Sequence, residues 1–194
     1  MTMFTPQAQK GAKEILTTLL EKPAGLTIWE LAKLTKNQTS LTQDKQSALS
    51  RPVKKLDNDG YLTTNGKKYL LTFKGFITAL TIIETGEVPE AASIYLRNFA
   101  MQHQAILEVT RLAYKRQRFR YESGILNMYQ LTAKSLLSEG FNFKEESGDN
   151  YVRAVTAHIL NNYVNSREDP NNSENDDVLI GFFPDESEIS ELDE

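Results

Sequence analysis

The sequence predicts a mainly α-helical protein that contains one small β-hairpin. Apolar residues recur at intervals of three or four along most of the chain before residue 165, which is the spacing of amphipathic helix faces. Two short β-prone runs interrupt this pattern on either side of Asn65-Gly66. Because Asn and Gly tolerate the positive φ angles of a two-residue turn, these runs predict a hairpin.

Composition is typical of soluble globular proteins. Apolar residues make up 40% of the 194 residues and charged residues 25%. The absence of cysteine excludes disulfides and thiolate-ligated zinc. No apolar run approaches the ~20 residues that a membrane-spanning helix needs, and the first residues lack the features of a secretory signal. We therefore expect a cytoplasmic protein that makes no membrane contact.

The net charge of −4 is an average over three unlike segments. Residues 1–86 hold 12 Lys and Arg against 7 Asp and Glu, whereas residues 87–165 hold 9 against 8. Residues 166–194 hold 1 against 11. This distribution predicts a basic first domain over 1–86, a helical region over 87–165 and an acidic, disordered tail over 166–194.

Two helices are predicted in the first 35 residues. The first begins near Pro6, which suits the first turn of a helix, and ends at Lys22-Pro23. Thr27 and Glu30 have the spacing of a capping box, in which each side chain bonds a backbone N–H near the other residue. This pattern predicts a second, short helix. Trp29, in its first turn, is expected to pack into the core.

Two positions compete for the start of a third helix. Residues 40–43 can cap it, and so can Ser47. Inside a helix, Pro52 would remove a backbone hydrogen bond and clash with the preceding turn, at a cost of ~3 kcal/mol. Pro52 therefore favours a start near Ser47 to Ser50. The apolar stripe of this helix is Leu49, Val53 and Leu56, and Asn58-Asp59-Gly60 ends it.

After Pro89 the pattern is helical again. Two adjacent apolar stripes extend from Tyr95 to Tyr114 and form a face wider than one surface helix needs. This breadth predicts a central helix, or one that is shared with a second subunit, and so favours a homodimer. Two further helices are expected, one that ends at Gly140 and one over residues 150–163.

The order helix, short helix, turn, helix, hairpin and helix is joined by three local motifs. They are Leu26-Thr27-Ile28-Trp29-Glu30-Leu31-Ala32, then Ser50-Arg51-Pro52-Val53-Lys54-Lys55-Leu56-Asp57-Asn58-Asp59-Gly60-Tyr61-Leu62, and Leu71-Thr72-Phe73-Lys74-Gly75, in which Thr72 is the expected cap of the last helix. In this order and spacing, residues 8–85 resemble the winged helix-turn-helix family of DNA-binding regulators. The resemblance implies that Asn65-Gly66 is the tip of the wing. Pro52 departs from the helix-forming residue that is usual in the family.

A helix fits the major groove of DNA, and a hairpin can reach the neighbouring minor groove or backbone. Arg can pair with guanine and Gln with adenine, whereas Ser and Lys mainly contact phosphates. The predicted DNA-binding residues are Gln43, Gln46, Ser47, Ser50, Arg51, Lys54 and Lys55 on the third helix, with Lys67 and Lys68 beside the wing tip. We therefore expect a transcriptional regulator that binds double-stranded DNA as a homodimer. For each residue taken singly, a solvated helix face explains the charge better than a DNA contact does.

Several parts of the chain are open to more than one interpretation. A winged helix can also be an inert scaffold, while the helical half and the acidic tail bind a protein partner. Within the tail, Val178–Phe183 can dock on such a partner or on the chain's own basic surface, or the tail can serve solubility alone. Lys115–Arg120 can touch phosphates, but the solvated last turn of a helix explains this cluster better.

The sequence does not favour an enzyme. His103 and His158 are the only histidines, and each lies in or beside an apolar stripe without a carboxylate at metal-ligand spacing. We expect both to be packed structural residues. The sequence has no glycine-rich phosphate loop, nucleophile elbow or zinc motif. We therefore expect no catalytic residue, no metal and no cofactor.

Overall fold

The structure is a computed structural model, and it describes residues 6–35, 43–117, 119 and 121–166. These residues are mainly helical, with a two-stranded antiparallel sheet, as the sequence predicts. The first half contains α1 (Pro6–Leu20), α2 (Ile28–Thr35), α3 (Gln43–Asn58), β1 (Leu62–Asn65), β2 (Lys68–Leu71) and α4 (Phe73–Ile82). The second contains α5 (Ala92–Gln102), α6 (Gln104–Gln117), α7 (Glu122–Ser138), α8 (Gly148–Ile159) and a π-helical turn, Leu160–Val164.

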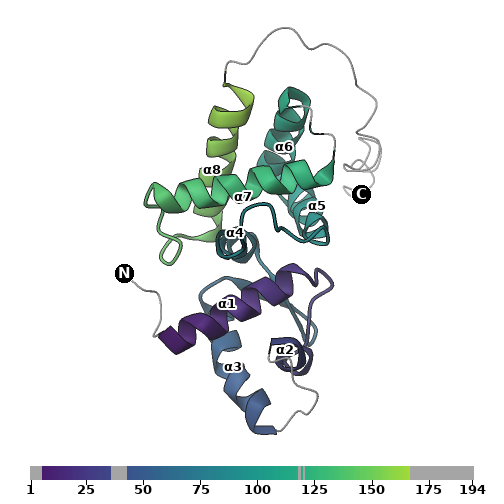
Figure 1. The fold of residues 1–194 in the computed structure, drawn as a ribbon, viewed down its shortest axis with the longest axis vertical. Helices are drawn as coiled ribbons and strands as arrows, with labels where there is room; N and C mark the ends of the chain where they lie inside the picture. The colour runs from purple at the N-terminus through teal and green to yellow at the C-terminus, as the bar shows by residue number, and fades with distance from the viewer. Residues whose placement is uncertain (1–5, 36–42, 118, 120, 167–194) are drawn as a thin grey trace, which may run out of the picture.

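Helix α4 lies between two groups of helices (Figure 1). Helices α1, α2 and α3 form one end of the molecule, and α5 to α8 form the other. Helix α4 packs against α1 on one side and against α7 and α8 on the other, which explains why most of its residues are buried. One continuous hydrophobic core therefore runs through both groups.

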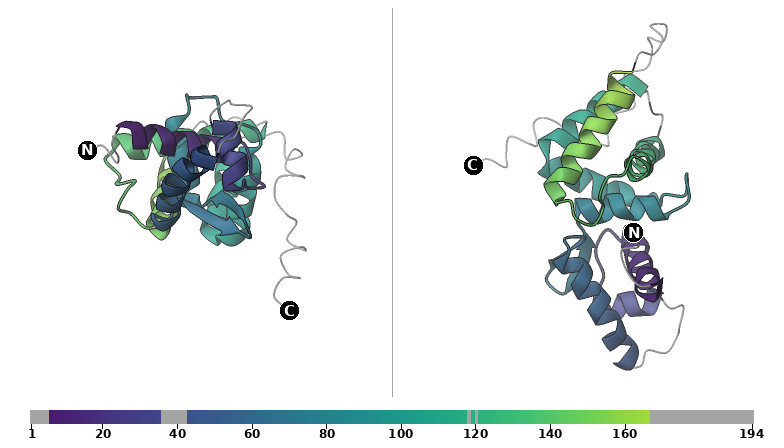
Figure 2. Two further views of the ribbon diagram at one scale, coloured as in Figure 1. Left: turned by 90° about the horizontal axis from the view of Figure 1, so that it is seen from below. Right: turned by 90° about the vertical axis from the view of Figure 1, so that its left-hand side faces the viewer.

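Hydrogen bonds also cross the predicted domain boundary at residue 86. The Tyr95 hydroxyl of α5 donates to the carbonyl oxygen of Leu19 over 3.1 Å and accepts from the backbone N–H of Leu71 over 3.3 Å. The two ends are thus joined by a helix and by buried polar contacts, and Figure 2 shows the two groups of helices from two further directions. The division into domains stays a prediction.

Both predicted helix caps are confirmed. The backbone N–H of Thr27 donates to Glu30 Oε2 over 2.8 Å, and the backbone N–H of Glu30 donates to Thr27 Oγ1 over 3.2 Å. At the start of α4, the backbone N–H of Gly75 donates to Thr72 Oγ1 over 3.1 Å. These bonds satisfy N–H groups that have no partner within the helix.

Of the two starts that the sequence leaves open for α3, the structure has the earlier one, so the late start that Pro52 favours is wrong. The helix begins at Gln43 and continues through Pro52. Its stripe of Leu49, Val53 and Leu56 is buried against α1 and α2. Burial of an aliphatic side chain contributes ~1.5–3 kcal/mol, so three of them outweigh the ~3 kcal/mol cost of one internal proline.

The hairpin forms where it was predicted, but its turn is shifted by one residue. Asn65 pairs with Lys68, so the turn residues are Gly66 and Lys67, and Gly66 has the positive φ of 64°. This register places Leu62 opposite Leu71, and both are buried. A turn at Asn65-Gly66 would have placed other residues opposite Leu62 and Leu71, because a change of register changes which side chains meet.

Leu26, just before α2, is joined to the hairpin by a second, very short strand pairing. The backbone N–H of Leu26 donates to the carbonyl oxygen of Tyr69 over 3.1 Å, and the N–H of Tyr69 donates back to Leu26 over 2.8 Å. Gly25 precedes this bridge with a φ of 78°. A Cβ at Gly25 would lie 2.9 Å from Leu70 Cγ, so a glycine allows the close approach.

Residues 95–114 form two helices instead of one long helix, which corrects the prediction. The chain leaves helical geometry at His103, between α5 and α6, with φ −132° and ψ 106°. Each helix buries its own apolar face within the chain; these faces are Tyr95, Leu96, Phe99 and Ala100 on α5, and Ile106, Leu107, Val109 and Ala113 on α6. The breadth of the apolar pattern therefore no longer argues for a second subunit.

The described part of the chain contains no helix that is both long and apolar enough to span a lipid bilayer.

Gly75 provides a test of how closely α4 packs on the start of the hairpin. A Cβ at Gly75 would lie 1.9 Å from the carbonyl oxygen of Tyr61, which is backbone and cannot easily move. Gly75→Ala is expected to lower the free energy of unfolding by about 3 kcal/mol or more, measured by urea denaturation. Gly11→Ala in α1 is the control, because a Cβ at Gly11 meets no atom within 4 Å. This variant is expected to raise the free energy of unfolding by up to ~1 kcal/mol. Wild-type stability in Gly75→Ala would contradict this packing.

Candidate nucleic-acid interface

Three basic residues lie on the outward side of α3. Arg51, Lys54 and Lys55 are all exposed, while the apolar stripe on the opposite side of the helix is buried. Their spacing of three and four residues places them on one face. Ser50 is half-buried at the edge of the core stripe and is therefore less accessible than the other three.

The remaining predicted positions on α3 lie in its first turns. Gln43, Gln46 and Ser47 belong to the helix, but their side chains are outside the described part of the structure. From the backbone alone, Ser47 lies one turn before Arg51 and shares its face.

The hairpin carries two further exposed lysines. Lys67 is one of the two turn residues, and Lys68 is the first residue of β2. Lys68 lies close to the turn before α2, because a Cβ at Gly25 would lie 3.2 Å from the Lys68 Cβ. Hydrogen bonds from Thr27 are the main cause of a lowered pKa of the Glu30 carboxyl, and the charge of Lys68 adds to this effect. Tyr69 is half-buried against the core, as its alternation with the lysines suggests. We call Arg51, Lys54, Lys55, Lys67 and Lys68 the basic face.

The prediction that Trp29 packs into the core is wrong. Its side chain is 47% exposed, and Lys33 Nζ lies 4.3 Å from the centre of the indole ring. Helix α2 buries Leu31 and Ala32, with Ile28 partly buried beside them. Positions 28, 31 and 32 share the inward face of a helix, so positions 29 and 33 lie on the outward face.

One basic residue of the first half has a different role from the basic face. Lys74 is 5% exposed, and its ammonium donates to the carbonyl oxygens of Glu146 over 2.9 Å and Lys144 over 3.3 Å. It also lies 4.5 Å from the centre of the Tyr61 ring. Burial lowers the pKa of Lys74, while the charges of Asp59 and Glu146 oppose that shift.

Tyrosines complete the cluster around Lys74. The Tyr61 and Tyr151 hydroxyls both donate to the carbonyl oxygen of Phe143, the latter over 2.5 Å. Burial is the largest cause of a raised pKa in both tyrosines, so they remain neutral donors. We call Tyr61, Lys74 and Tyr151 the junction cluster; it holds the start of the hairpin against the loop between α7 and α8. The sequence offered no indication of it, because its members are up to 90 residues apart.

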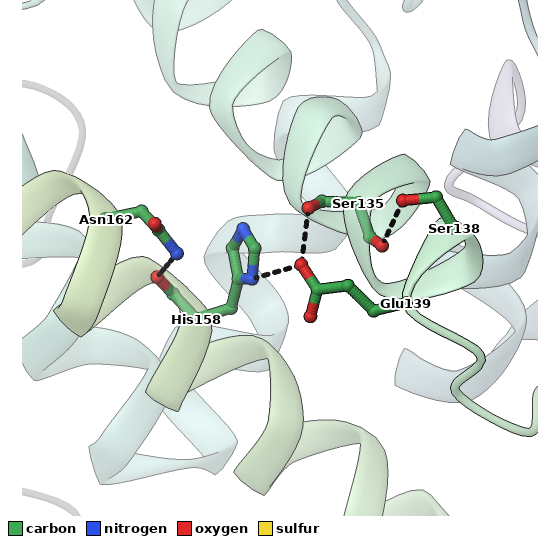
Figure 3. Close-up of polar contacts among 5 residues, drawn as sticks. All are labelled: Ser135, Ser138, Glu139, His158 and Asn162. Atoms are coloured by element: carbon green, nitrogen blue, oxygen red, sulfur yellow. Dashed lines mark hydrogen bonds and ion pairs between the residues drawn. The ribbon is translucent and has the colours of Figure 1, made fainter.

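His158 belongs to a polar contact between α7 and α8 (Figure 3). Its Nδ1 lies 3.8 Å from Glu139 Oε1, which also accepts a 2.8 Å hydrogen bond from Ser135 Oγ. The serine therefore bonds to the carboxylate and not to the imidazole, which differs from the nucleophile–base contact of hydrolases. His103 is half-buried between α5 and α6. Among the described residues, no group of three or more His, Asp and Glu is placed to hold a metal ion.

Two predicted features fall wholly or partly outside the described residues. Arg118 and Arg120 of the second basic cluster are not described, whereas Lys115 and Arg116 are exposed near the end of α6. The segment Val178–Phe183 also lies outside the described residues.

Comparison with known protein families, with curated proteins and with solved structures found no match.

Pro52 tests whether α3 is strained where its basic side chains project. Pro52→Ala is expected to raise the free energy of unfolding by about 2 kcal/mol. The substitution removes the ~3 kcal/mol that a proline costs inside a helix, but it also loses the ~1 kcal/mol that proline contributes by restricting the unfolded chain. Urea denaturation measures the change. Ser50→Ala, two residues earlier in the same helix, controls for helix propensity and should raise the free energy of unfolding by no more than ~0.5 kcal/mol. Unchanged or lower stability in Pro52→Ala would show that the helix already accommodates the ring.

Proposed function

We propose that the chain binds double-stranded DNA and acts as a transcriptional regulator. In this proposal α2 and α3 form a helix-turn-helix, and β1 and β2 form the wing. The observation that carries the proposal is the basic face: exposed cations project from the outward side of α3 and from the turn of the hairpin that packs beside it. This combination suits a helix in the major groove and a hairpin along the neighbouring backbone.

The order of the elements supports a winged helix. Helix α1 is followed by the Leu26 bridge, then α2, α3 and the two strands of the hairpin. The bridge at Leu26 adds a third short strand to the hairpin and fixes it to the start of α2. A wing held in this way keeps its turn in one position relative to α3, which a backbone contact requires.

Within the basic face, arginine and lysine suit different contacts with DNA. Arg51 has a planar guanidinium that can bond the O6 and N7 atoms of guanine, so it is the proposed base-reading residue. The lysines at 54, 55, 67 and 68 are point charges that suit phosphate oxygens. Trp29 and Lys33 add an exposed ring and an exposed cation on the outward side of α2, which packs against α3.

The homodimer is a separate part of the proposal. Its support is general: such motifs commonly bind two half-sites through two copies. A mass measurement of the complex with DNA distinguishes one bound copy from two.

A protein-interaction module is the second candidate function, and exposed apolar side chains on α5 favour it. Ile94 is 45% exposed and Met101 is 61% exposed, and their spacing of seven residues places them on one helix face. In this alternative the helical half and the acidic tail bind a protein, and the winged helix is a scaffold. Absence of duplex DNA binding even at low salt would favour this candidate.

Arg51→Ala tests the base-reading role. Selection of duplexes from a random pool first identifies the preferred sequence. The variant is then expected to lose about 1–3 kcal/mol of binding free energy for that sequence, and much less for unrelated DNA. Fluorescence anisotropy at fixed salt measures both affinities. Lys144→Ala serves as a control, because Lys144 is exposed on the loop between α7 and α8. Equal losses for both DNAs would assign Arg51 to the backbone instead.

Lys67→Ala tests the wing. Because a lysine on a phosphate releases counterions without reading the base, the variant should weaken binding to all sequences alike. The slope of the logarithm of affinity against the logarithm of salt concentration should become shallower by about 0.9 for each phosphate that is no longer neutralised. Titrations at several salt concentrations give this slope. A slope equal to that of the wild type would remove Lys67 from the interface.

A further inference from the structure

A pocket of about 410 Å³ lies where the hairpin meets the helical half. Its walls come from four places in the fold: the hairpin, the start of α4, the second half of α5 and the start of α8. Thr63 and Leu70 contribute from the two strands, and Val152 contributes from α8. A molecule in this space would therefore touch both halves of the chain at once.

The pocket has an aromatic wall and a polar rim. Phe73 and Phe99 are 5% and 6% exposed, and their rings meet edge to face with centroids 5.4 Å apart. Neutral hydrogen-bonding side chains, Asn98 and Gln102, are exposed along α5 at its edge. Apolar walls that carry polar groups, at the junction of two parts of a fold, occur in small-molecule sites, and the volume lies within their usual range of roughly 300–1,000 Å³.

Three side chains that can carry a charge near neutral pH line the pocket, Lys74, His103 and Asp149, and of these Asp149 alone is exposed. Lys74 lines it, but the ammonium is already bonded to two carbonyl oxygens and lies over the Tyr61 ring. The carboxylate at the rim is Asp149, which is exposed in the first turn of α8. A ligand amine can reach this carboxylate from water, whereas a ligand carboxylate would meet its repulsion.

We propose that this pocket binds a small aromatic amine. The ring packs against Phe73, Phe99 and Leu70, and the amine faces Asp149. Amide oxygens of the α5 side chains accept the remaining N–H bonds. The proposal concerns a second site and does not depend on DNA binding, because none of the basic face lines the pocket.

The test uses the full chain and three related probes: phenethylamine, 2-phenylethanol and phenylacetate. Saturation-transfer NMR reports which of them binds, and titration gives relative affinities. Phenethylamine is expected to bind best and phenylacetate worst. In Asp149→Asn, the affinity for phenethylamine should fall about fivefold, because an exposed charge pair contributes up to ~1 kcal/mol. The affinity for 2-phenylethanol should be unchanged. No binding of any probe, or equal binding of phenethylamine and phenylacetate, would overturn the proposal.

Two variants that fill the pocket, and one control, locate the probe. Thr63→Trp fills the pocket from an exposed position on β1 and should abolish binding. Thr64→Trp is the matched control, because Thr64 is the next exposed residue of the same strand and is not among the lining residues. Asn98→Trp fills the space from α5 and provides a second variant should Thr63→Trp unfold, which circular dichroism reveals. Undiminished binding in a folded filling variant would place the probe elsewhere and contradict the proposal.

Discussion

The contact between the start of α4 and Tyr61 is the constraint on which the arrangement of the two halves depends. Gly75 leaves no room for a side chain there, and Lys74 beside it donates to the loop between α7 and α8. Tyr61 and Tyr151, from opposite halves, donate to the same carbonyl oxygen. Because Tyr61, Lys74 and Tyr151 are buried, a donor among them that lost its carbonyl partner would be left unsatisfied, at a cost of ~1–3 kcal/mol. The junction cluster thus fixes where the hairpin begins.

From that fixed start, the position of the hairpin turn follows by backbone geometry. The pair Leu62 and Leu71 sets the register, and the bridge from Leu26 to Tyr69 sets the orientation relative to α2. Lys67 consequently occupies the turn itself instead of flanking it. The shift of one residue strengthens the case for a backbone contact, since a turn residue is the most exposed part of a hairpin.

The sequence predicts those features that depend on neighbours within a few residues. The caps at Thr27 and Thr72, the hairpin and the buried stripe of α3 are of this kind. Features that depend on distant partners were missed or wrong: the turn register, the exposed Trp29 and the junction cluster. The break at His103 was missed because one helix and two helices in succession have the same apolar spacing. Of the basic face, the residue types and positions were predictable, but the half-burial of Ser50 was not.

In the proposed binding to DNA, burial also decides which cations are available. The first 86 residues carry an excess of basic over acidic side chains, and the motif that resembles the region after a wing includes Lys74. Its ammonium is nevertheless held inside the molecule, so it cannot displace counterions from a phosphate. The exposed lysines of α3 and the turn can. Since salt-dependent binding depends on contacts and not on net charge, a chain with a net charge of −4 can still offer these exposed cations to phosphates.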